Sequence, residues 1–152
     1  MNKRMKAVAD LEEKFNEINA LRDVATPPTG WLRLVRQSLG MTLQQVAVKL
    51  GISKQSVREM ESRELTGAIT LKRLREAAEA MEMNLVYGFV PKDGSVENLI
   101  ERKARELATE IIEKASVTMR LENQENAPER IHRAIEERAE ELKRQLPKML
   151  WD

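Results

Sequence analysis

The middle of the chain alternates helix start and helix stop signals at short intervals, and this spacing constrains the fold more than any other feature of the sequence. Three residues stand where an N-cap hydroxyl would accept hydrogen bonds from the free amides of a first helical turn: Thr42, Ser53 and Thr70. Three glycines supply turns or helix stops: Gly40, Gly51 and Gly67. The spacing predicts short helices at 31–39, 43–50, 54–63 and 71–81. Segments this short and this close indicate one compact helical bundle.

Longer helices are expected on both sides of this bundle. Apolar residues recur at helical spacing over residues 2–21, and the breaker Thr26-Pro27-Pro28-Thr29-Gly30 ends that helix. Two further helices are predicted at 95–122 and 126–146. Charged residues make up 34% of the chain and aromatic residues 3%, which favours solvated helices over a β-sandwich or barrel. We predict a mainly α-helical protein with three regions: 1–26, 27–91 and 92–152.

One segment breaks the helical period. Residues 84–91 are rich in β-branched and aromatic side chains and end in a proline, which predicts a short strand. A single strand cannot satisfy its own backbone amides and carbonyls, so pairing with the same strand of a second subunit is the economical solution. We therefore expect a homodimer. The pairing residues would be Leu85, Val86, Tyr87, Gly88, Phe89 and Val90.

Residues 43–62 have the spacing of a helix-turn-helix. Ala47 is followed four residues later by Gly51, and the buried positions of such a unit fall on Val46, Leu50, Ile52, Val57 and Met60. A small residue lets two helices cross closely, and glycine permits the positive φ of a very tight turn. The second helix is then free to enter the major groove of DNA.

The side chains on this second helix suit DNA. Cations would reach phosphates, and amide or guanidinium groups would pair with base edges. The expected contacts from the second helix and its N-cap are Ser53, Lys54, Gln55, Ser56 and Arg58. Gln44 and Gln45, at the start of the preceding helix, are placed for the phosphate backbone. Any four-helix bundle needs small residues at its crossings, so a protein-binding bundle is the alternative.

Residues 30–81 resemble the Cro/repressor class of regulators, and the resemblance implies the fold of that class and a double-stranded operator DNA partner. Charge gives independent support. Residues 30–91 carry nine basic and six acidic side chains, whereas residues 92–152 carry twelve and fourteen. The basic surplus therefore lies in the segment with the helix-turn-helix spacing.

Catalytic constellations are missing from the sequence. It has no phosphate loop and no nucleophile with a histidine base, so we predict no enzyme activity. There is no cysteine and a single histidine, His132, to which we assign no role; we expect neither a metal nor another cofactor. No basic and apolar leader opens the chain, and its most apolar stretch is far shorter than the roughly 20 residues that span a bilayer. We expect a cytoplasmic protein without membrane contact.

The first tail helix has an apolar stripe that ends in polar residues. The stripe comprises Val96, Ile100, Ala104, Leu107, Ile111 and Ala115, and the same spacing continues to Thr118 and Glu122. Glu122 falls in the last helical turn, where the macrodipole disfavours negative charge, and such a breach of a local rule often marks function. The alternative is that the stripe is simply core between the two tail helices.

The run Thr118-Met-Arg-Leu-Glu122-Asn123 resembles the Ser/Thr-x-x-x-Glu-Gly/Asn inhibitory helix that restrains Fic-domain AMP transferases. The resemblance implies that Glu122 pairs with an arginine of the Fic active site and occupies the space of the γ-phosphate of ATP. Thr118 would be the helix position one turn earlier, and Asn123 the residue that closes the helix. A carboxylate can replace a phosphate at an arginine through a charge-assisted contact.

Residues 5–95 are similar to the mobile mystery protein A family, through the run 27–33, the helix-turn-helix, and the runs 70–80 and 85–91. Proteins of that family accompany a Fic-domain partner, mobile mystery protein B. The resemblance implies an antitoxin that represses its own operon and holds the Fic toxin inactive. The alternative is a stand-alone repressor whose tail helices serve dimerisation or effector binding.

Overall fold

The computed structural model describes residues 2–121 and 128–152, with side chains up to residue 117 and again from residue 128. It is mainly helical, as predicted. The elements are α1 (Lys3–Ile18), η1 (Asn19–Leu21), α2 (Trp31–Ser38), α3 (Leu43–Leu50), α4 (Lys54–Thr66), α5 (Leu71–Ala80), α6 (Val96–Leu121), α7 (Pro128–Gln145) and η2 (Lys148–Trp151). They form two compact units. We call Asp23–Gly88 the central unit and Met1–Arg22 with Phe89–Asp152 the terminal unit.

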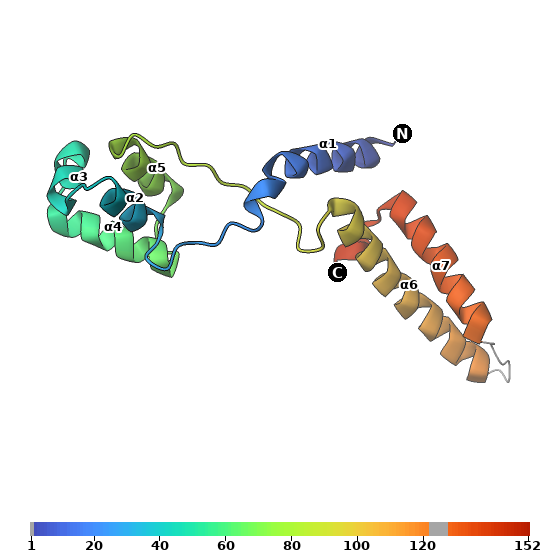
Figure 1. Cartoon of the computed structure of the whole chain (residues 1–152). Coiled ribbons are helices and arrows are strands. Elements are labelled where there is room, and N and C mark those ends of the chain that lie inside the picture. Colours follow the sequence, from blue (N-terminus) through green and yellow to red (C-terminus); the bar gives the residue numbers. More distant parts are fainter. Residues whose placement is uncertain (1, 122–127) are drawn as a thin grey trace. The chain divides into compact units, whose positions relative to one another are not determined.

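Helices α2–α5 form the bundle of the central unit (Figure 1). The predicted N-caps are confirmed. The hydroxyl of Thr42 accepts from the Gln45 amide at 3.0 Å while the Gln45 side chain accepts from the Thr42 amide at 2.8 Å, which is a capping box. The hydroxyls of Ser53 and Thr70 cap α4 and α5 by accepting from the amides of Ser56 and Arg73, each at 3.1 Å. Each cap contributes about 1 kcal/mol to helix stability.

The tight turn between α3 and α4 depends on Gly51. Its φ of 67° lies in the left-handed region, where a Cβ atom is unfavourable. The next residue, Ile52, donates its amide to the carbonyl of Ala47 at 3.0 Å and packs its side chain against the core. These contacts end α3 and redirect the chain at once into α4.

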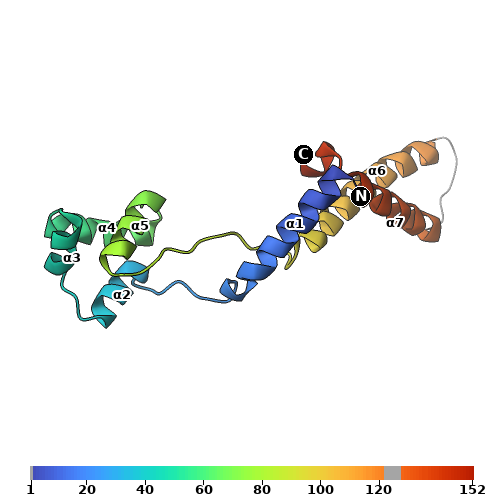
Figure 2. The same cartoon turned by 90° about the horizontal axis from the view of Figure 1, so that it is seen from above.

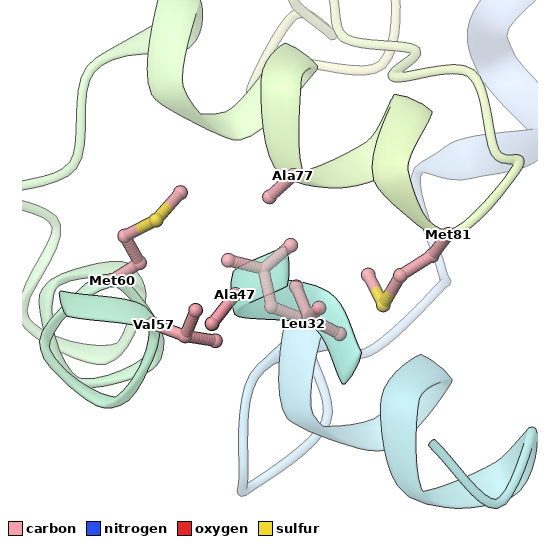
Figure 3. Close-up of a cluster of buried hydrophobic side chains, with 7 residues drawn as sticks. Leu32, Ala47, Val57, Met60, Ala77 and Met81 are labelled. Atoms are coloured by element: carbon pink, nitrogen blue, oxygen red, sulfur yellow. The ribbon is translucent and has the colours of Figure 1, made fainter. Parts of the chain in front are cut away.

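The core of the central unit is built around the α3–α4 crossing. Val46, Val57 and Met60 are 2%, 4% and 7% exposed, so three predicted core positions are buried, and Ala47, the small residue predicted at the crossing, is 0% exposed. Leu50 and Ile52 are partly buried against the same cluster. Figure 3 shows the small Ala47 side chain among side chains from the other helices of the bundle: Leu32, Val57, Met60, Ala77 and Met81.

In the terminal unit, α6 and α7 pack side by side as an antiparallel hairpin (Figures 1 and 2). Alanines at the interface allow close approach of the two helices, and the buried cluster consists of Ala104, Ala108, Ala139, Leu142 and Leu150. The predicted stripe is correct from Val96 to Ile111 but wrong at its end. Ala115 is exposed, whereas the next residue of α6, Ser116, is buried at 6%, so α6 is still covered at this level but on a different position from the predicted one.

Polar contacts hold α1 in the terminal unit. The helix buries no residue, but the carboxylate of Glu12 accepts from the amides of Val96 and Glu97 at 3.2 and 3.0 Å. Glu12 thereby caps α6 from outside, beside the local cap Ser95. Arg4 donates to the carbonyl of Leu146 at 2.6 Å, at the end of α7. The sequence predicted this amphipathic helix but not its partner.

The predicted strand is not present in the single chain, since residues 2–121 and 128–152 contain no strand. Residues 84–90 have no regular secondary structure and form no backbone hydrogen bond with the described residues. Val86, Tyr87 and Phe89 are exposed, with the Arg75 guanidinium 5.6 Å from the centre of the Tyr87 ring. A strand requires a hydrogen-bonded neighbour, so pairing with a second subunit stays a prediction.

No helix within the described ranges is both long enough and apolar enough to cross a membrane.

Candidate nucleic-acid interface

Helix α4 presents one face to the core and the opposite face to solvent. Val57, Met60 and Glu61 are buried, at 4%, 7% and 8% exposure. With 3.6 residues per turn, the positions most nearly opposite them in the first two turns of α4 are Gln55 and Glu59, and both are exposed. A polar face on a helix that follows a tight turn is the arrangement that a major groove accepts.

The predicted contact residues lie at the surface of two helices. Gln44, Gln45, Ser53, Lys54, Gln55 and Arg58 are exposed, and Ser56 is half-buried. The structure brings some of them together. The hydroxyls of Ser53 and Ser56 lie 2.9 Å apart, and the Arg58 guanidinium lies 3.5 Å from the Gln55 side-chain oxygen. Gln45 uses its side-chain oxygen in the capping box, so its amide nitrogen is the group left for another partner.

Gln44 and Gln45 line a surface hollow with Leu39 and Val48, at the start of α3. The side chains of α4 line two other hollows, one beside α2 and one beside α5. Of the predicted α4 contacts, Arg58 lines the hollow beside α2 and Ser56 lines the hollow beside α5.

A buried ion pair that sequence reasoning missed fixes α4 against α2. Arg36 donates to both carboxylate oxygens of Glu61, at 3.0 and 2.8 Å, and the two side chains are only 12% and 10% exposed. The Arg36 guanidinium also donates to the Met41 carbonyl at 3.2 Å. Each charge is thus paired with an opposite charge where little of either side chain is exposed. The available signal was Glu61 itself, a carboxylate one position after Met60 on the buried face of α4.

A second glutamate of α4, Glu64, caps α2. Its carboxylate accepts from the amides of Trp31 and Leu32 at 2.7 and 2.8 Å, at the positive end of the helix dipole. Gly30 makes this approach possible, because a Cβ atom there would lie 3.0 Å from a carboxylate oxygen of Glu64. The sequence indicated Gly30 only as part of a helix breaker, but the residue also leaves space for the Glu64 carboxylate.

Most cations of the central unit have no carboxylate partner. Its ion pairs, within the part of the chain that the structure describes, are Arg36–Glu61 and Arg73–Glu76. Arg33, Lys54 and Arg58 are exposed and pair with no acidic side chain of the described residues. Their charge is therefore available to an anionic partner.

The comparison with protein families agrees with this geometry. The family model Helix-turn-helix matches residues 32–87, which comprise almost all of α2–α5 and the segment after α5. Residues 32–87 are a helix-turn-helix domain of the Cro/C1 type. A domain of this type indicates a DNA-binding transcription regulator with double-stranded DNA as its partner. Comparison with curated proteins and with solved structures finds no match to the chain.

The match of the helix-turn-helix domain does not extend to the α6–α7 hairpin. Glu122 and Asn123 of the predicted inhibitory motif lie outside the described residues. Thr118 belongs to α6, but its side chain is also outside the description. The inhibitory motif therefore stays a prediction from sequence.

Exposed ion pairs join the elements of the hairpin. Arg105 of α6 binds both carboxylate oxygens of Glu136 of α7, which holds the pKa of Glu136 below its ordinary value of 4.5. Arg102 binds Asp93 at 2.8 and 3.1 Å and likewise lowers the pKa of that carboxyl from 3.8. Lys143 of α7 reaches Glu101 of α6 at 3.2 Å. Arg105 and Lys143 are thus paired with carboxylates of the hairpin itself.

Proposed function

We propose that the helix-turn-helix domain represses transcription by placing α4 in the major groove of an operator. The main support is the exposed polar face of α4, which lies opposite Val57 and Met60. The tight turn at Gly51 sets the direction of this helix. Gln55 lies at the centre of this face and has the amide geometry for bidentate contact with an adenine edge. Lys54 at the start of α4 and Gln44 at the start of α3 would contact phosphates.

The test is selection of bound sequences from random DNA duplexes with the full-length chain, followed by titration of the selected operator at several salt concentrations. The expected result is an enriched sequence and an affinity that falls steeply with salt, because bound cations displace counterions from phosphates. Gln55→Ala should cost about 1–3 kcal/mol for the selected operator. Gln37→Ala, an exposed glutamine of α2, is the control. Absence of any enriched sequence would contradict the proposal.

We further propose that the repressor is a homodimer paired through residues 84–90. The composition of these residues is typical of a β-strand. They make no backbone hydrogen bond with the described residues, and Val86, Tyr87 and Phe89 are exposed. Exposed apolar side chains beside unpaired backbone groups favour strand addition by an identical segment. Two helix-turn-helix domains would then meet the two halves of a palindromic operator.

Val86 and Val48 provide a matched test, because both are 69% exposed in the single chain. Val86→Asp should shift the protein from dimer to monomer in sedimentation equilibrium, since it places a charge in each copy of the paired segment. Val48→Asp, on α3, should leave the mass unchanged. A wild-type monomer at all accessible concentrations would exclude the pairing.

The sequence resemblance supports a second role, in which the repressor also inhibits a Fic-domain toxin of the mobile mystery protein B kind. The support is the run from Thr118 to Asn123 and the similarity of residues 5–95 to the partner family. In this proposal Glu122 occupies the active-site arginine of the toxin and blocks the γ-phosphate of ATP. The tail then inhibits AMP transfer, while the helix-turn-helix domain binds the operator.

Co-expression of the neighbouring Fic protein with wild type or with Glu122→Gly tests this role, with AMP transfer from labelled ATP as the assay. Wild type should abolish transfer, and Glu122→Gly should restore it while the complex still forms. Glu125→Gly, outside the motif, is the matched control. If wild type fails to bind the Fic protein, the chain is a repressor without this partner. If Glu122→Gly still inhibits, another residue carries the inhibition.

A further inference from the structure

A hollow of about 270 Å³ lies beside α4 on the side of α2. Its polar lining comes from both helices and from the segment that precedes α2: Thr29, Arg33, Arg36, Arg58, Glu61 and Ser62. Three of these residues are arginines and one is a glutamate. None of them except Arg58 was expected from sequence to meet DNA.

The hollow carries an uncompensated positive charge. The carboxylate of Glu61 is bound on both oxygens by Arg36, so this pair is internally neutral. Arg33 makes no ion pair and no side-chain hydrogen bond within the described residues, and Arg58 makes a single 3.5 Å contact with Gln55. Two guanidinium groups from two helices therefore line one hollow without a counter-charge. A guanidinium is well suited to bind phosphate oxygens.

The position of Arg58 on α4 separates it from the base-reading face. At 100° per residue it lies about 60° around the helix from Gln55, towards α2. When a helix lies in a major groove, its centre faces the bases and its flanks face the sugar-phosphate backbones on either side. A side chain on the α2 flank would therefore meet a backbone rather than a base edge.

We propose that this hollow binds a phosphodiester of the operator backbone, held between Arg33 of α2 and Arg58 of α4. Thr29 and Ser62 also line this hollow. The inference rests on the proposed insertion of α4 into the major groove, and it assigns Arg58 to the backbone and adds Arg33 to the interface. The Arg36–Glu61 ion pair lines the same hollow and joins α2 to α4.

Salt dependence of binding by the full-length protein tests the assignment. A contact with one phosphate contributes about 0.9 to the slope of log K against log salt concentration. Arg33→Gln and Arg58→Gln should each weaken binding and reduce the slope by up to that amount. The double variant should lose about one phosphate rather than two, since both arginines hold the same group. Arg33→Lys should keep most of the slope. Lys6→Gln removes an equal charge from exposed α1 and should leave the slope unchanged.

Sequence preference provides the second readout. Loss of a backbone contact should weaken the selected operator and a scrambled duplex equally, whereas Gln55→Ala should weaken mainly the operator. A wild-type slope that Arg33→Gln leaves unchanged would overturn the inference while the proposed function stands. A reduced operator preference in Arg58→Gln would overturn it too, because Arg58 would then read a base. If wild type binds no DNA, both the proposed function and this inference fail.

Discussion

The central and terminal units stabilise a helix N-terminus by the same device but use their other charges differently. Glu64 reaches from α4 to the first amides of α2, and Glu12 reaches from α1 to the first amides of α6. The central unit buries the pair Arg36–Glu61 and leaves most of its other cations without a carboxylate partner. The terminal unit has exposed ion pairs along and between its helices.

This difference in charge pairing indicates which cations of each unit are available to bind an anion. Exposed ion pairs contribute about 0–1 kcal/mol each, but they neutralise the charges they join. In the terminal unit Arg102 and Arg105 are engaged by Asp93 and Glu136, so the surface of the hairpin has little free positive charge at these points. In the central unit, Arg33 and Arg58 have no carboxylate partner among the described residues. The whole chain has a net charge of +1, and its distribution rather than its total identifies the DNA-binding unit.

The largest expected effect is the loss of stability when the buried Arg36–Glu61 ion pair is broken. Glu61→Gln leaves the Arg36 charge largely uncompensated in a buried site and should lower the free energy of unfolding of the central unit by about 3–5 kcal/mol. Urea unfolding followed by Trp31 fluorescence in a Trp151→Phe background measures it. Glu76→Gln removes the exposed Arg73 pair of the same unit and should cost less than about 1 kcal/mol. Equal losses from the two substitutions would contradict the distinction between buried and exposed charge.

An intermediate effect is expected from the two glutamate caps, and it tests whether the units unfold separately. Glu64→Ala should destabilise the central unit by about 1–2 kcal/mol, because two helix amides lose a charged acceptor. Glu12→Ala should do the same to the terminal unit. Trp31 reports on the first unit and Trp151 on the second when the other tryptophan is replaced by phenylalanine. If either substitution shifts both reporters equally, the two units unfold as one.

The smallest effect concerns pH and the terminal unit. Arginines hold the pKa values of Asp93 and Glu136 below 3.8 and 4.5 in the folded state. Their stabilisation is therefore complete above the ordinary pKa values and is lost as pH falls through the lowered ones. The urea midpoint reported by Trp151 should fall over this acidic range. Glu136→Gln should reduce that dependence, and the exposed Glu137→Gln should not; a midpoint independent of pH would show that these pairs add nothing.

Much of the fold could be predicted because its signals are local. The cap of α3 needs only Thr42 and Gln45, three residues apart, and its end needs Gly51 in the left-handed conformation. The buried positions Val46 and Val57 follow from helical periodicity once both helices are placed. The polar face of α4, and with it Gln55 and Lys54 as candidate contacts, follows from the same periodicity.

Other features could not be predicted because they depend on which segments meet. Ala115 continues the spacing predicted for the α6 stripe but is exposed, whereas its neighbour Ser116 is buried at 6%, because the segment that a helix meets decides which position of a turn is covered. The amphipathic pattern of α1 indicated a packed helix, but not that Glu12 would cap α6, 84 residues away from its amide partner Val96. The segment after α5 has β-strand character, but a single chain offers it no partner strand.

The sequence by itself determined the helices, their caps, the turn at Gly51 and the helix-turn-helix spacing. These depend on backbone sterics and hydrogen bonds between residues a few positions apart. Only the tertiary structure decided that Glu61 is bound by Arg36, that Glu64 caps α2 and that Arg33 and Arg58 line one hollow. Each of these depends on charges brought together from separate helices, because the energy of a charge is set by its spatial neighbours rather than by its place along the chain.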